Sequence, residues 1–277
     1  MSTDKQLPKD NFPHGRWLLC APEHFDIKYE INPWMDMKIT PASETAAKQW
    51  RTLHHTLIRL GAYVEYIQGE DHVPDLVYTA NAGLVKGKKF VLSAFTHPQR
   101  QEEEPIFEEW FARNGFEVLK VTKGTFEGEG DALFAGETLF CGHGFRSEPA
   151  AYDEVKDLLG LQKTVLCELT DSRFYHLDTC FCPIDPDNAL VNPRAFTPAS
   201  LEEMGKNIKL HEVSEGDAAN FVCNAVVLGK DVILPAGCDD TYTYLASLGY
   251  TAHPVEMNEF MKGGGASKCL SLQLDRD

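Results

Sequence analysis

The sequence lacks the features that would associate it with a membrane or a nucleic acid. No run approaches the roughly 20 apolar residues that a membrane-spanning helix needs, and the N-terminal segment has no apolar stretch typical of a secretory signal. Basic residues are scarce, since 26 Lys and Arg stand against 42 Asp and Glu, for a formal net charge of -16. This charge repels phosphate groups and favours cationic ligands, so we expect no nucleic acid and no membrane as partner. The missing signal and membrane-spanning run predict a cytoplasmic location.

Metal-binding patterns are missing as well. The eight cysteines form no C-x-x-C pair and no Cys/His cluster at the spacing of a zinc site. In a reducing compartment such cysteines are usually small buried hydrophobic residues. We therefore predict no metal and no cofactor. Cys269 is the exception among the cysteines because of its position.

What the sequence does contain is an internal repeat. Five segments share a polar residue, a short apolar strand, a turn rich in Gly, Asp or Asn, and often a second strand. Their leading polar residues, about 45–50 positions apart, are Asn81, Asp131, Asp178, Asn224 and Cys269. Segments with helical periodicity lie before and between them, at 46–61, 103–116, 150–161, 198–208 and 241–249. A further strand is expected after each helix, for example at 62–67, 116–121, 164–169 and 251–257.

Five similar units predict a five-bladed α/β propeller with the short strands inside and the helices outside. A single catalytic domain would span residues 17–277, after a flexible tail at 1–16. The opening strand at 16–22 would pair with the last unit and close the ring. The alternative is an open sheet of βαβ units, which needs shorter spacing and parallel strands, whereas these hairpins are antiparallel.

Equivalent units would bring the five leading polar residues together near one axis. Burying them without a purpose is costly, which favours a site there; the alternative is that they are turn and cap residues. His176 lies two positions before Asp178, so in a strand both would face the axis with Cys269. The glycine-rich segment 126–133 adds Glu127, whereas we expect Glu129 to be solvated.

A thiol, an imidazole and several carboxylates favour attack on a planar cation. Acidic walls would repel the oxyanion of peptide hydrolysis but would hold a guanidinium through paired hydrogen bonds. Attack by the Cys269 thiolate on the central carbon gives a tetrahedral adduct, and the bound cation would lower the thiol pKa. His176 would protonate the departing ammonia and then activate water. The residues alone thus predict a guanidine hydrolase.

Several motifs resemble those of the guanidino-group-modifying enzymes, a superfamily with the five-bladed pentein fold. Within it the sequence is most similar to the arginine dihydrolase domain of a cyanobacterial arginine-catabolic enzyme, from about Trp17 to the C-terminus. The motifs are INPWM (31–35), YTANAGLV (78–85), FEG-x-GDAL (126–133), GFRSE (144–148), RFYHLDTCFCP (173–183) and GGGASKCL (263–270). The fifth motif together with Lys-Cys-Leu is specific, whereas GFRSE alone is weak.

The resemblance implies roles at the reacting end of the substrate, L-arginine. Cys269 would be the nucleophile and His176 the acid and base. Glu127 and Asp178 would hold the guanidinium, with support from Asp131. No role for a metal is implied, and a homo-oligomer is compatible with the family.

It also implies contacts at the amino-acid end. Arg100 and Arg146 would bind the substrate carboxylate, although a surface salt bridge is the alternative for Arg100. Asn32 would contact the head group, or could be a turn residue before Pro33. Gly263 stands where the cyanobacterial proteins carry alanine, in a glycine run that could close over the substrate or serve as a connector.

Asn81 distinguishes the members of the superfamily. Deiminases and dimethylargininases carry aspartate here, whereas the dihydrolases carry asparagine. The resemblance therefore implies two hydrolytic cycles, which give ornithine, two ammonia and carbon dioxide. The alternatives are an arginine deiminase or dimethylargininase that gives citrulline, an amidinotransferase, and a non-catalytic binding module such as the ribosome anti-association factors of this fold.

Overall fold

Five small sheets carry the fold of this mixed α/β protein, whose computed structural model describes residues 12–276. Each sheet has three strands. In four of the sheets an antiparallel hairpin forms two of the strands, and in the fifth the two ends of the chain form the antiparallel pair. In all five the third strand pairs parallel to the middle strand. The strands are β3 (Gly83–Lys86), β4 (Lys89–Leu92), β5 (Glu117–Lys120); β6 (Ala132–Ala135), β7 (Thr138–His143), β8 (Lys163–Glu168); β9 (Phe181–Asp185), β10 (Asn188–Val191), β11 (Lys209–Glu212); β12 (Val226–Leu228), β13 (Asp231–Pro235), β14 (Thr251–Val255); and β15 (Leu272–Gln273), β1 (Arg16–Cys20), β2 (Tyr63–Ile67).

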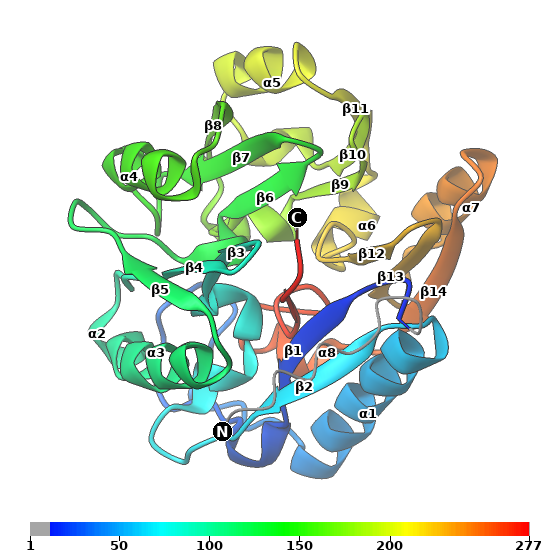
Figure 1. Ribbon diagram of the computed structural model, residues 1–277. Coiled ribbons are helices and arrows are strands. Elements are labelled where there is room, and N and C mark those ends of the chain that lie inside the picture. The colour runs from blue at the N-terminus through cyan, green and yellow to red at the C-terminus, as the bar shows by residue number, and fades with distance from the viewer. Residues whose placement is uncertain (1–11, 277) are drawn as a thin grey trace.

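One helix precedes the third strand of each sheet. These helices lie at the periphery, and the C-terminal segment runs through the middle of the molecule (Figure 1). They are α1 (Ser43–Arg59), α3 (Glu103–Arg113), α4 (Pro149–Leu159), α5 (Pro198–Gly205) and α7 (Asp239–Ser247), with the shorter α2 (Pro98–Gln101), α6 (Glu215–Ala219) and α8 (Asn258–Met261). The predicted hairpins and main helices are confirmed. The strand expected after each helix is present in all five sheets, β11 included, whereas the helices α6 and α8 were not predicted from the sequence.

Local sequence explains the hairpins and the helix ends. Gly87, Gly136 and Gly229 each open a two-residue hairpin loop at positive φ, the conformation that tight hairpins require. In α4, Pro149 occupies the first turn, where its missing N–H costs nothing. The helix stops at Gly160 in the left-handed conformation, whose N–H bonds to a carbonyl of the last turn.

The chain closes on itself through its two ends. β15 pairs antiparallel with β1, with Trp17 opposite Gln273 and Leu18 opposite Leu272. This confirms the predicted pairing of the opening strand with the last unit. Residues 1–11 of the predicted tail lie outside the described residues, and β1 begins at Arg16.

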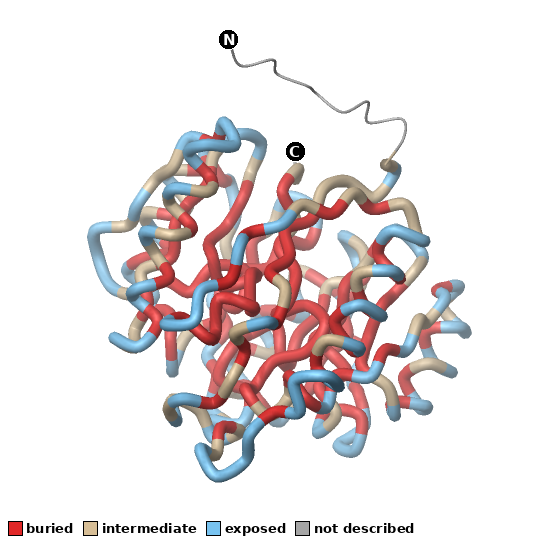
Figure 2. The backbone as a smooth tube through the Cα atoms, turned by 90° about the horizontal axis from the view of Figure 1, so that it is seen from below, coloured by how far each residue is buried: buried red, intermediate tan, exposed pale blue. Residues whose placement is uncertain are grey.

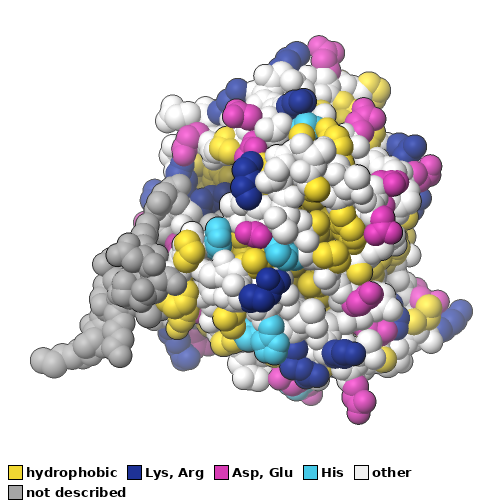
Figure 3. Space-filling view, turned by 90° about the vertical axis from the view of Figure 1, so that its right-hand side faces the viewer, with side chains coloured by type: hydrophobic (Ala, Val, Ile, Leu, Met, Phe, Trp, Pro, Cys, Tyr) yellow, Lys and Arg dark blue, Asp and Glu magenta, His cyan; other side chains and the backbone are white. Residues whose placement is uncertain are grey.

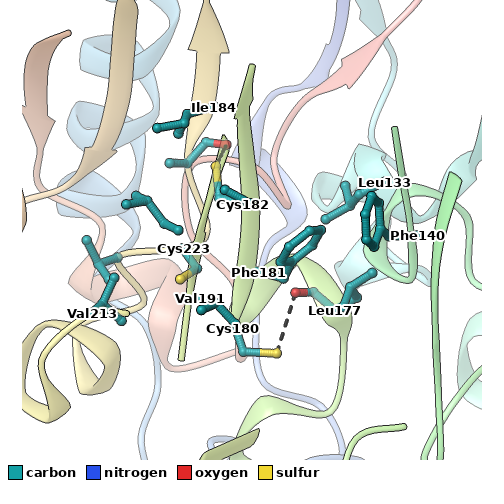
Figure 4. Close-up of a cluster of buried hydrophobic side chains, with 14 of the residues drawn as sticks. Leu133, Phe140, Leu177, Cys180, Phe181, Cys182, Ile184, Val191, Val213 and Cys223 are labelled. Carbon is teal, nitrogen blue, oxygen red and sulfur yellow. Dashed lines mark hydrogen bonds between the residues drawn. The ribbon is translucent and has the colours of Figure 1, made fainter. Parts of the chain in front are cut away.

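The interior is apolar and takes up the cysteines. Buried chain fills the middle of the molecule, and exposed segments form its rim (Figure 2). Cys180, Cys182 and Cys223 pack beside Phe181 in the largest buried cluster (Figure 4). All eight cysteines are free and buried, which confirms the prediction of small buried hydrophobic residues for those other than Cys269. On the face in Figure 3, basic and acidic side chains are interspersed, so the acidic excess does not form one patch there.

Candidate active site

The five leading polar residues lie in short turns just before the inner strands, and these turns meet. Asn81 and Asp178 belong to the 3-10 turns Thr79–Ala82 and Leu177–Thr179, and Asp131 follows the turn Gly128–Gly130. His176 precedes the second of these turns, so the prediction that His176 and Asp178 share one face of a strand is wrong. A 3-10 turn replaces the expected strand here. His176 bonds to Glu127, whereas Asp178 bonds to Cys269.

Cys269 lies between two side chains from other units. Its Sγ is 3.1 Å from Oδ2 of Asp178 and 3.0 Å from Nδ2 of Asn224. Burial and then the negative charge of Asp178 raise the pKa of the Cys269 thiol well above its usual range. The S–H group of Cys269 therefore donates a hydrogen bond to Asp178. A positive charge near the sulfur would favour formation of the thiolate.

Asp178 is the carboxylate that faces the thiol. Burial raises its pKa to about 7, although the charge of Lys268 and hydrogen bonds from Cys269 and Asn224 act in the opposite direction. Its second oxygen, Oδ1, is buried and has no hydrogen-bond partner among residues 12–276. This oxygen is available to accept an N–H from a bound molecule.

Glu127 is shared by an imidazole and a guanidinium. Its Oε2 lies 2.7 Å from Nε2 of His176 and 3.1 Å from Nη1 of Arg146. Burial alone would raise the pKa of Glu127, but Arg146 and His176 outweigh it and hold the pKa well below its usual value. Arg146 also packs over the ring of Tyr175, at 4.5 Å from its centre. No hydrogen bond joins His176 to Cys269 within the described part of the chain.

Arg100 is buried, so the alternative of a surface salt bridge is wrong. Its guanidinium forms two hydrogen bonds with Glu103, at 2.7 and 2.8 Å. It donates a third to Oδ1 of Asn81, at 2.9 Å. Asn81 in turn donates to the carbonyl of Glu127, at 3.3 Å. The amide of Asn81 therefore connects Arg100 with the segment that carries Glu127.

A cavity lies next to the hydrogen bonds of Arg100, Asn81 and Arg146 and reaches Cys269. Its lining includes six predicted site residues together with others that were not predicted: Ile31, Asn32, Met35, Asp75, Tyr78, Asn81, Arg100, Arg146, Tyr175, Gly263, Gly265 and Cys269. His176, Glu127, Asp178 and Asp131 do not line it. Glu127 and Asp178 contact the lining residues Arg146 and Cys269, and His176 contacts Glu127.

Asp131 supports its neighbours. Its Oδ2 accepts from the backbone and the hydroxyl of Ser147, at 3.2 and 2.7 Å, and Oδ1 accepts from the N–H of Leu177, at 3.1 Å. It thereby ties the turn after His176 to the segment that carries Arg146. Burial, partly offset by His176, raises its pKa to about 6.

Sequence reasoning missed Asp75 and the two tyrosines. Asp75 is buried, accepts a hydrogen bond from Tyr29 at 3.0 Å through Oδ2, and leaves Oδ1 without a partner among the described residues. Burial raises its pKa, whereas Arg100 lowers it. A lone carboxylate within the apolar run VPDLV was the signal that could have identified it. Tyr78 and Tyr175 carried no comparable signal.

The glycine run forms a wall of the cavity and is not a solvent-exposed connector. The carbonyl of Gly263 accepts from Nδ2 of Asn32, at 3.0 Å, and that of Gly264 accepts from the hydroxyl of Tyr175, also at 3.0 Å. Asn32 is therefore more than a turn residue. All three glycines are buried, and these bonds join the segment around Asn32 to the loop before Cys269.

Glu129 corrects another expectation, because it is buried and not solvated. Its Oε2 pairs with Nζ of Lys268, at 2.7 Å, and neither residue lines the cavity. The glycines on either side turn the backbone inward, so its charge requires a buried partner.

Among residues 12–276, no group of three or more His, Cys, Asp and Glu is placed to hold a metal ion, and the absence of a metal stays a prediction. The described helices include none with the length and apolar character to cross a bilayer.

Comparison with known structures first gives the class. The N-terminal domain of ArgZ, described as an arginine dihydrolase from cyanobacteria and solved as a mutant bound to its substrate, superposes with a TM-score of 0.90 at 41% identity, over 94% of this chain and 98% of that one. A dimethylarginine dimethylaminohydrolase adduct with S-methyl-L-thiocitrulline matches at 19% identity with a TM-score of 0.79, over 94% of this chain and 100% of that one, which shows a common fold.

Sequence comparison then gives the family. The family described as N,N dimethylarginine dimethylhydrolase, eukaryotic, matches residues 22–274. The bifunctional arginine dihydrolase/ornithine cyclodeaminase ArgZ of Synechocystis is 42% identical over 94% of this chain, which spans 37% of that relative's length. The N(G),N(G)-dimethylarginine dimethylaminohydrolase of Mycobacterium tuberculosis is 35% identical over 94% of this chain and 85% of its own length.

The chain belongs to the dimethylarginine dimethylaminohydrolase family. The predicted resemblance to guanidino-group-modifying enzymes, with similarity to the arginine dihydrolase domain, is confirmed.

Proposed function

We propose that this protein is a cytoplasmic arginine dihydrolase that converts L-arginine and two water molecules into ornithine, two ammonia and carbon dioxide. Its catalytic domain would span residues 17–277 as a five-bladed propeller. The observation that carries the proposal is one cavity that reaches the Cys269 thiol and is also lined by Arg100 and Arg146. A thiol and two guanidinium groups suit a ligand with a reactive cation at one end and a carboxylate at the other.

The amino-acid end of arginine would lie among the cavity's charged groups. Arg100 and Arg146 would bind the carboxylate. Asp75, with one oxygen free, and Asn32 would receive the ammonium. Arg146 contacts Glu127 in the structure, so the substrate carboxylate competes with Glu127 for Arg146. Its binding would release one oxygen of Glu127 for the substrate guanidinium.

The substrate guanidinium would then supply a positive charge next to the Cys269 thiol. Glu127 and the free oxygen of Asp178 would accept its N–H groups, with the central carbon facing Sγ. Its positive charge lowers the thiol pKa, and the thiolate attacks the carbon. His176, hydrogen-bonded to Glu127, protonates the ammonia that leaves. It then takes a proton from the water that breaks the carbon–sulfur bond and gives citrulline.

A second cycle would act on the ureido carbon of citrulline. Thiolate attack expels the second ammonia, and hydrolysis of the thiocarbamate gives a carbamate that loses carbon dioxide to leave ornithine. Asn81 supports this cycle, because its neutral amide faces Arg100 and the Glu127 backbone. An aspartate there would add a negative charge, which suits a cationic guanidinium better than a neutral ureido group.

Product stoichiometry tests the proposal. The purified protein is incubated with L-arginine while citrulline, ornithine and ammonia are quantified. We expect two ammonia per ornithine without accumulation of citrulline. Cys269→Ser should lose at least about a thousandfold in kcat. Cys238→Ser is the matched control, because Cys238 caps α7 and does not line the cavity.

The family match makes dimethylargininase the second candidate. Turnover of N,N-dimethylarginine to citrulline and dimethylamine, with no turnover of arginine, would establish it and exclude the dihydrolase. One citrulline and one ammonia per arginine would instead indicate a deiminase. Undiminished activity in Cys269→Ser would refute the covalent mechanism for all three.

A further inference from the structure

The side chain of Asn224 organises the turn that carries Cys269. Its Oδ1 accepts hydrogen bonds from the backbone N–H groups of Ala266, Lys268 and Cys269, at 3.0, 3.0 and 3.1 Å. Its Nδ2 donates to Sγ of Cys269 at 3.0 Å and to the carbonyl of Asp178 at 3.2 Å. Asn224 is fully buried. One amide thus fixes the nucleophile's backbone and contacts its sulfur.

The backbone before Asn224 is itself held in an uncommon conformation. Phe221 has φ of 56°, and among residues 12–276 no other non-glycine residue has positive φ. A bulky residue in this region is strained. Trp34 packs on the Phe221 ring, with 4.5 Å between ring centres, and the N–H of Asn224 bonds to the Phe221 carbonyl at 2.8 Å. The fold therefore holds the amide in place before any ligand binds.

The two polar neighbours of the sulfur have opposite effects on its protonation. The carboxylate of Asp178 accepts the S–H and favours the thiol. The amide N–H of Asn224 can only donate, so it favours the thiolate. The backbone N–H of Ala266, which bonds to Oδ1 of Asn224, acts on the thiol pKa in the same direction as the amide. Asn224 therefore contacts the sulfur directly and also holds this second donor in place.

We propose that Asn224 is a positioning residue that holds Cys269 for attack and stabilises its thiolate through the Nδ2–H···Sγ hydrogen bond. The identification of Cys269 as nucleophile rests on the proposed function. Asn224 does not line the cavity. Its removal should therefore lower kcat at least about tenfold and change KM for arginine by less than about threefold.

The test is the pH profile of Cys269 alkylation by iodoacetamide, followed by mass spectrometry of the Cys269 peptide. Asn224→Ala removes the donor and the acceptor. Asn224→Asp keeps the acceptor for the three backbone N–H groups but puts a carboxylate oxygen at the sulfur. At a fixed pH below the midpoint we expect the alkylation rate to fall at least about tenfold in both, which is the loss of thiolate that a rise of one pH unit in the midpoint produces. Asn220→Ala is the control, because this exposed amide bonds to the Gly237 carbonyl.

A midpoint that stays at the wild-type pH in the folded variants would overturn the proposal, even if activity fell, because a structural role alone leaves thiol ionisation unchanged. If Asn224→Ala does not fold, Asn224→Asp decides the question. Alkylation needs no substrate. A wild-type protein inactive on guanidines would refute the proposed function, whereas the alkylation profile would still decide the role of Asn224.

Discussion

At the scale of single residues, Asp178 connects the chemistry of the site to the stability of the fold. Burial raises its pKa from 3.8 to about 7, so the folded protein holds this proton more tightly than the unfolded chain. Its contribution to stability is complete below the unfolded pKa and is lost as the pH rises through about 7. The site therefore costs the protein stability at neutral pH.

Replacement of Asp178 by asparagine should reverse this cost. We expect Asp178→Asn to raise the free energy of unfolding relative to wild type by at least about 1 kcal/mol more at pH 8 than at pH 5, with loss of activity. Urea unfolding at both pH values measures the difference. Asp185→Asn is the control and should have the same effect at both pH values, because hydrogen bonds from Tyr250 and Asn188 outweigh burial and lower the Asp185 pKa from 3.8, which leaves this carboxyl ionised at pH 5 and pH 8. An equal effect of Asp178→Asn at both pH values would contradict the assignment.

At the scale of elements, the sequence predicted the repeated parts better than the turns between them. Alternating apolar residues around Gly-containing turns identified the hairpins, and helical periodicity identified the main helices. β11 (Lys209–Glu212) could be expected only from the repeat, because His211 is its one buried side chain and the segment has no apolar pattern. The 3-10 turn Leu177–Thr179 was not predicted, because packing sets its conformation. Asp75 joins the site through contacts between loops distant in the sequence, so the apolar run around it indicates a buried carboxylate but not its partners.

The glycine loop gives a prediction at this scale. A Cβ on Gly263 would overlap the hydroxyl oxygen of Tyr78, which donates to the carbonyl of Phe260 at 2.8 Å. We expect Gly263→Ala to lower the free energy of unfolding by about 1–3 kcal/mol through overpacking. Tyr78→Phe removes the overlapping atom, so the double variant should lose less than the sum of the single variants. A double-mutant cycle by urea unfolding measures this coupling. Strict additivity would show that the loop moves away from Tyr78.

At the scale of the whole molecule, the ends of the chain complete one sheet together. β15 contributes only Leu272 and Gln273, so few backbone hydrogen bonds hold it against β1. Side-chain packing must therefore provide most of the stability of this strand pair. Leu272 and its partner Leu18 are both fully buried in the cluster that also contains Phe90 and Phe107. The residues that close the chain therefore lie in the same core as the neighbouring sheet, three positions after Cys269.

This closure distinguishes a ring from an open array of repeats. In an open array each unit depends on its immediate neighbours, and a defect at one end leaves the other end folded. In the proposed propeller every sheet needs both of its neighbours, so a defect where β15 pairs with β1 should spread to the other sheets.

We expect Leu272→Ala to lower the free energy of unfolding by about 2–5 kcal/mol. It should also lower amide hydrogen-exchange protection equally in β1 (Arg16–Cys20) and in β7 (Thr138–His143), which belongs to another sheet. Leu166→Ala, at a side chain 44% exposed, is the matched control and should change stability by less than about 0.5 kcal/mol. Loss of protection confined to β1 and β2 would mean that the five sheets unfold separately and that residues 17–277 do not form one cooperative domain.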